Sequence, residues 1–208
     1  DENVVIGYNA GDSFDAESQN VLIGSSAGGN ASFAASNCVA VGAGALEGAN
    51  TQEGIVAIGK NALNALTSGT ANLAIGFEAM KVHTSGLRNT AIGYQAMDDN
   101  DAGSNSLASE DNVFMGFGAG SGTYTDVKVE NNVAIGSYSM GAALAGAKDN
   151  VIVGYNTAGT LTSASGSVLL GSNAGTTITT GNQNIAIGNS AMNGATTTGD
   201  NNIAIGVS

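Results

Sequence analysis

Residues 184–192 read Asn-Ile-Ala-Ile-Gly-Asn-Ser-Ala-Met, and the core of this stretch recurs along the chain: one polar residue, three apolar residues, then glycine. It occurs twelve times, mostly 17 or 18 residues apart, with one step of 23 and one of 20. A fixed period of this length is typical of solenoids. We therefore predict a single repeat domain, residues 1–208, of about twelve coils. The motif glycines are Gly7, Gly24, Gly42, Gly59, Gly76, Gly93, Gly116, Gly136, Gly154, Gly171, Gly188 and Gly206.

The three apolar residues of each motif are rich in Val and Ile and too few for a helix, so they predict short strands. Stacking them coil on coil gives an all-β, parallel β-solenoid, a rod on the order of 55 Å long at about 4.8 Å per strand. Asparagine opens nine of the twelve motifs, where it favours left-handed corners and stacked amide ladders. These are Asn3, Asn20, Asn72, Asn89, Asn112, Asn132, Asn150, Asn184 and Asn202, while Cys38, Ile55 and Ser167 open the others.

Three consecutive apolar residues in a strand place the outer two on one face and the middle one on the other. We expect the outer Val and Ile residues to fill the coil interior and the middle residue, usually Ala, to point out of it. An outward apolar residue in every coil needs a cover. Identical copies around an axis supply one to all coils equally, so we predict a homotrimeric rod.

The charge balance excludes two classes of partner. Seventeen acidic and five basic residues give a net charge of −12, which repels nucleic acid and anionic membrane surfaces. The longest apolar runs are too short to cross a bilayer, so we expect no membrane insertion. The first residues do not resemble a signal peptide, so we expect any export signal, and further fibre segments at both ends, to lie outside this stretch.

Side chains for catalysis are scarce in this sequence. The single histidine, His83, lies beside Lys81 and Thr84 between two motifs, where we expect a solvated loop residue. The single cysteine, Cys38, rules out an internal disulfide and is expected to be a small buried hydrophobic residue. We therefore predict neither an enzyme nor a cofactor.

A longer coil after Gly93 carries a group of acidic residues. Asp99, Asp101 and Gly103 alternate somewhat like the start of a calcium loop, because a hard cation needs several oxygen ligands from a sharply turning chain. A downstream bidentate glutamate is missing at the usual spacing. A calcium site and a solvated acidic loop are the two interpretations.

Aromatic residues follow the motif glycine in several coils. Phe77, Tyr94 and Phe117 do so in consecutive coils, and Tyr8 and Tyr155 do so elsewhere. Rings at one position stack along the rod as a ladder. The ladder either packs the corner of the coil or, if exposed, forms a sugar-binding strip.

The motif in Asn89–Met97 and Asn184–Met192 resembles the head repeats of trimeric autotransporter adhesins, and similar repeats occur in bacteriophage tail fibres. The likeness covers nearly the whole chain. It implies a left-handed parallel β-roll, three chains wide, in an extracellular fibre of the bacterial surface or of a virion tail.

These observations lead to two expectations about function. The first is a structural and adhesive fibre module that attaches to a cell-surface glycan or protein receptor. The alternative is an architectural filament subunit without a receptor, assembled end to end through the open strand edge after Asn202. An adhesive module has recognition side chains on its loops, whereas a filament subunit needs complementary ends.

Overall fold

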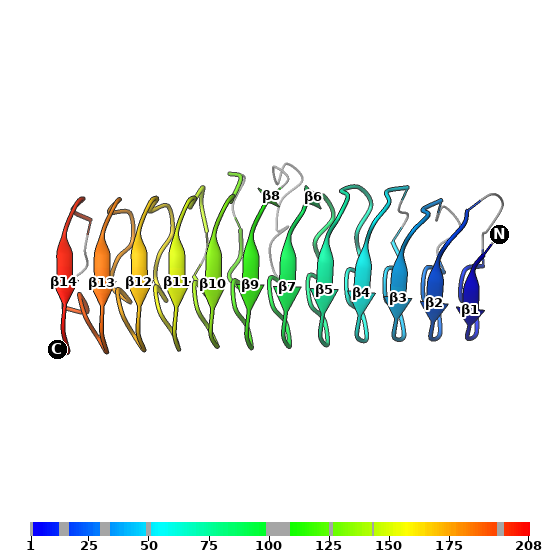
Figure 1. Cartoon of the computed structure of the whole chain (residues 1–208), viewed down its shortest axis with the longest axis horizontal. Helices are drawn as coiled ribbons and strands as arrows, with labels where there is room; N and C mark the ends of the chain where they lie inside the picture. Colours follow the sequence, from blue (N-terminus) through cyan, green and yellow to red (C-terminus); the bar gives the residue numbers. More distant parts are fainter. Residues whose placement is uncertain are drawn as a thin grey trace.

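Twelve three-residue strands line up side by side along the whole chain, with the termini at opposite ends of the rod (Figure 1). The computed structural model describes residues 2–12, 17–29, 34–48, 51–98, 109–124, 127–142, 144–194 and 198–208. The strands are β1 (Val4–Ile6), β2 (Val21–Ile23), β3 (Val39–Val41), β4 (Val56–Ile58), β5 (Leu73–Ile75), β7 (Thr90–Ile92), β9 (Val113–Met115), β10 (Val133–Ile135), β11 (Val151–Val153), β12 (Val168–Leu170), β13 (Ile185–Ile187) and β14 (Ile203–Ile205).

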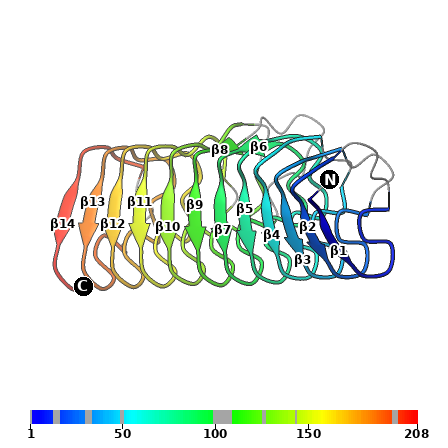
Figure 2. The same cartoon turned by 45° about the vertical axis from the view of Figure 1, so that its right-hand side comes forward.

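All twelve strands are parallel and each pairs with the strand of the next coil without a register shift, as in Val4↔Val21 and Ile6↔Ile23. Figure 2 shows the rest of each coil running back behind this sheet. A second, two-stranded sheet pairs β6 (Gly86–Leu87) with β8 (Ser109–Glu110) along one edge. The described residues contain no helix. The predicted all-β, parallel β-solenoid is therefore confirmed.

The motif glycine ends each strand because no other residue fits there. Gly59 has φ +132, and a Cβ at this position would lie 2.2 Å from the carbonyl oxygen of Gly76 in the next coil. The same conflict repeats from coil to coil, for example at Gly136 against Gly154 (2.3 Å). L-residues disfavour this φ and the neighbouring backbone excludes a side chain, so glycine at the eleven strand ends that face a further coil follows from stacking.

The motif asparagines form a buried ladder, but they are not the left-handed residues of the corner. The amide oxygen of Asn132 accepts the backbone N–H of Asn150 (3.2 Å), and its own backbone N–H donates to Asn112 Oδ1 (3.1 Å). The left-handed residue is the preceding one, Asn131 (φ 58). Each amide thus replaces a strand hydrogen bond at the point where the chain turns. The expected amide ladder is confirmed. The expected left-handed conformation of the motif asparagine is wrong.

The two faces of the strands are reversed relative to the sequence prediction. The middle residue, such as Ala74 or Phe114, points into the coil and is fully buried in all but the two end coils. The outer residues point away from the lumen and are half-buried or exposed. The prediction that Val and Ile fill the lumen is therefore wrong.

The narrowness of the lumen explains this reversal. The middle strand residue shares the lumen with the residue six positions later, on the opposite wall of the same coil. Where the middle residue is large, the opposite one is small: a Cβ at Gly120 would lie 2.7 Å from Phe114 Cδ1, and one at Gly28 would lie 2.8 Å from Leu22 Cδ1. Where the middle residue is Ala, the opposite one is Leu or Met, as in Ala134 and Met140.

This compensation holds in every complete coil, so the lumen has room for only one large side chain at this pair of positions. The pairs are Val5 and Gly11, Leu22 and Gly28, Ala40 and Leu46, Ala57 and Leu63, Ala74 and Met80, Ala91 and Met97, Phe114 and Gly120, Ala134 and Met140, Ile152 and Ala158, Leu169 and Gly175, and Ala186 and Met192.

Exchanging the large and small positions of one coil tests this packing rule. Ala134→Leu alone should overpack the lumen, at a cost of about 1–3 kcal/mol. Met140→Gly alone should leave a cavity, at a cost of about 2–5 kcal/mol. The double variant reproduces the native pair Leu169 and Gly175, so its loss of unfolding free energy should be well below the sum of the single losses. Urea denaturation of the four proteins gives the coupling.

Additive losses in this double-mutant cycle would show that the two side chains do not compete for one space. Met140 has φ 54, a value at which glycine is relaxed, so backbone strain from the new glycine does not mask the result.

Candidate binding surfaces

The outward face of the main sheet is a long apolar surface. We define it as the first and third residues of the twelve strands; Thr90 is its one polar member. Within the single chain these residues remain accessible to water, for example Val151 (41%) and Ile135 (38%) in the middle of the rod. Contiguous apolar surface of this extent on a soluble protein marks an interaction site.

An aromatic ladder runs along the corner of the coils next to this face, and it consists of Phe77, Tyr94, Phe117, Tyr138 and Tyr155. Neighbouring ring centroids lie 5.1, 5.2, 5.1 and 6.4 Å apart in chain order. The first three rings stack within 10° of parallel, while the last two pairs are edge to face. The five side chains are between 38% and 56% exposed. The structure therefore brings together the three predicted aromatic residues and adds two more.

Tyr138 was not predicted as a ladder residue because it lies two residues after its motif glycine instead of one. Its ring leans over Gly118 of the preceding coil, where a Cβ would lie 3.2 Å from Tyr138 Cδ1. The missing side chain at Gly118 admits the ring beside Phe117. The sequence did contain a signal for this ladder residue: an aromatic residue lies next to the expected position, and a glycine lies opposite it one coil away.

The geometry of the ladder limits how it can bind. Phe77, Tyr94 and Phe117 turn their faces toward one another, so a ligand reaches mainly their edges. Lys60 lies at one end, with its Nζ 5.9 Å from the centroid of the Phe77 ring. Stacking of sugar rings on the three predicted residues is therefore disfavoured, and the most exposed ring of the ladder is Tyr155.

Paired charges cover the edge of the rod near the second sheet. Arg88 donates to Asp111 through Nε (2.6 Å to Oδ1) and Nη2 (2.8 Å to Oδ2). This guanidinium lowers the pKa of the Asp111 carboxyl. Lys128 forms ion pairs with Glu110 and Glu130. These exposed pairs hold neighbouring coils together and contribute little free energy each.

His83 and Cys38 are both interior residues. His83 is 1% exposed and occupies the position, seven residues after a motif glycine, that Leu66 and Leu161 fill in other coils. The prediction of a solvated loop histidine is therefore wrong, because this position faces the lumen. Cys38 is fully buried as expected, and burial raises the pKa of its thiol.

The structure leaves the calcium interpretation as a prediction, since Asp99 and Asp101 lie outside the described residues. Among the residues that are described, no group of three or more His, Cys, Asp or Glu side chains could hold a metal ion. In the same part of the chain there is no helix of sufficient length and apolarity to cross a membrane.

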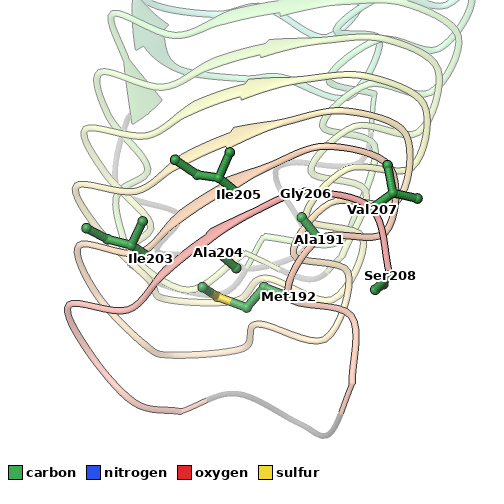
Figure 3. A pocket seen from close by; sticks show the side chains of 8 residues that line it. All are labelled: Ala191, Met192, Ile203, Ala204, Ile205, Gly206, Val207 and Ser208. Atoms are coloured by element: carbon green, nitrogen blue, oxygen red, sulfur yellow. The ribbon is translucent and has the colours of Figure 1, made fainter.

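The open C-terminal end of the lumen forms a pocket of about 370 Å³. Figure 3 shows Met192 and Ala204 facing each other across it, while Ile203 and Ile205 point away. Its lining is Ala191, Met192, Ile203, Ala204, Ile205, Gly206, Val207 and Ser208, without an ionisable side chain. Apart from the Ser208 hydroxyl, the pocket is lined by apolar side chains and Gly206.

No known protein family matches this chain, and neither does any curated protein or solved structure. Arguments about function therefore rest on the surfaces described above.

The buried thiol of Cys38 gives a probe of the solenoid's integrity. The thiolate is the reactive form, and burial both shields the sulfur and raises its pKa. We expect Cys38 to react with a thiol-specific disulfide reagent at pH 8 far more slowly in the native protein than in urea, by at least about a hundredfold. Stoichiometric labelling of the native protein within the time needed in urea would contradict the packing around β3.

Proposed function

We propose that this chain is a segment of a homotrimeric extracellular fibre, of a bacterial surface adhesin or a virion tail fibre, that attaches to a receptor. The observation that carries the proposal is the outward apolar face, which runs the full length of the rod. A stacked solenoid is a stiff, extended support, and such a support can hold recognition side chains at a distance from a surface.

The outward face favours self-association through the sheet. The burial of the middle residues removes the original reason for a trimer, but the outer residues now supply a stronger one: two side chains per coil, mostly Val and Ile, need a cover. A copy of the same face is equally apolar, equally long and has the same coil spacing. Symmetric packing around an axis then covers every coil in the same way.

A lysine on each face of one strand tests the interface. Ile75→Lys places a charge on the outward face, so it should convert the oligomer into a folded monomer, because an unpaired buried charge is costly. Ala74→Lys places the same charge in the lumen, so it should prevent folding of the coil. Light scattering coupled to size exclusion measures the mass, and circular dichroism measures the fold.

The wild-type chain should have a mass near three times 20.3 kDa. Gln183→Lys, at an exposed corner, is the matched control and should remain trimeric. A monomeric wild type, or a trimer that Ile75→Lys does not weaken, would overturn the proposed interface. A screen of glycans and host surface proteins tests the adhesive part, and binding to none of them would leave only the fibre.

A further inference from the structure

The coils do not need an aromatic residue at the corner position of the ladder in order to fold. Other coils place Ser25, Ala43, Ser172 and Asn189 at the same point, directly after the motif glycine, and those coils close and stack in the same way. Because the ladder's rings are between 38% and 56% exposed, packing explains only part of their presence. Five adjacent exposed rings therefore suggest a binding surface.

One end of the ladder is already covered by a cation. The Nζ atom of Lys60 lies 5.9 Å from the centroid of Phe77, within the range of a cation–π interaction. Lys60 belongs to the preceding coil and occupies the same corner position as the rings. The ladder thus shows which chemical group its ring faces accept.

The other end has no such cover. Tyr155 is the most exposed ring of the ladder, at 56%, and the next coil carries Ser172 at the corner, which is too short to cover the ring. We infer that the Tyr155 end of the aromatic ladder binds a positively charged side chain, arginine or lysine, of a partner polypeptide. This side chain takes the place over Tyr155 that Lys60 takes over Phe77.

The charge of the molecule favours a basic partner over a neutral one. The net charge is −12, and three of the five basic side chains, Lys81, Arg88 and Lys128, are engaged in ion pairs within the chain. The remaining acidic excess attracts cations and raises their rate of association. The aromatic ring faces and the negative potential of the molecule therefore both favour binding of a positively charged partner.

Amide groups next to Tyr155 suit an arginine in particular. Asn156 donates its side-chain N–H to Asn173 Oδ1 (3.1 Å), which aligns two amides, one on the residue after Tyr155 and one at the equivalent position of the next coil. A guanidinium stacked on Tyr155 presents N–H groups at its edge, and amide oxygens can accept them. We expect arginine to bind more tightly than lysine here.

The test uses a fluorescein-labelled peptide of alternating glycine and arginine, followed by anisotropy at physiological ionic strength. Tyr155→Ser introduces the residue that other coils carry at this corner and keeps the net charge. It should weaken binding about two- to fivefold, the usual worth of an exposed cation–π contact. Tyr155→Phe keeps the ring and should bind as the wild type does.

Two controls separate the ladder from general acidity. Tyr8→Ser makes the same change at the same corner position outside the ladder, in a coil without the paired amides of Asn156 and Asn173, so it should weaken binding less than Tyr155→Ser does. A peptide with neutral citrulline in place of arginine should bind much more weakly. The inference is overturned if Tyr155→Ser binds the arginine peptide as the wild type does, or if the citrulline peptide binds equally well. Loss of binding to a neutral oligosaccharide instead would assign the site to a glycan.

The inference extends the proposed adhesive function but does not require three chains. Tyr155 lies at the margin of the outward face, at the position that Val207 occupies in the last coil (Figure 3). Light scattering of Tyr155→Ser should give the wild-type mass. An unchanged mass with weakened peptide binding supports the site whether the protein is a monomer or a trimer, whereas a changed mass assigns Tyr155 to the contact between copies and overturns the inference.

Discussion

The width of the lumen controls the rest of this structure. Two walls of each coil approach so closely that one large side chain fills the space between them, and the opposite residue must then be Gly or Ala. The parallel stacking of successive coils along the rod adds a second constraint, because it leaves only glycine at the strand end. A lumen that admits one large side chain at this level cannot hold both outer residues of a strand, most of which are Val or Ile. They must lie outside, and the apolar outward face follows from the thinness of the core.

The positions of a coil fall into two groups, those that are nearly the same in every coil and those that vary from coil to coil. The motif asparagines, the motif glycines and the lumen pairs repeat in nearly every coil, so they maintain the rod. The corner after the glycine varies between Ser, Ala, Asn, Lys and aromatic residues while the backbone stays the same. Positions that are free to vary on a fixed scaffold are where recognition can be placed. The aromatic ladder occupies this corner in four of five consecutive coils, and in the fifth its ring comes from Tyr138, one residue further along.

The sequence predicts the solenoid, the strand positions and the ladder because each depends on a period that can be counted. The faces of the strands were predicted wrongly because three alternating residues show only that the outer and middle ones lie on opposite faces, not which face is inside. The deciding signal was nevertheless present: Leu22, Phe114 and Leu169 each precede a glycine by six residues, whereas Ala in that place precedes Leu or Met. His83 was missed for a different reason, since the interior position it occupies is visible only after the coils are aligned. Recognition of a partner leaves no periodic trace in the sequence, so a partner cannot be predicted from the repeat.

The large and small residues that compensate each other in the lumen determine how such a protein can change in length. Both members belong to the same coil and lie six residues apart, as Phe114 and Gly120 do. At these two positions a coil therefore carries its own filling, whichever member of the pair is large in the neighbouring coils. Duplication or loss of a whole coil keeps both members together, so the rod can be lengthened or shortened in units of 17 or 18 residues without a second substitution at this pair.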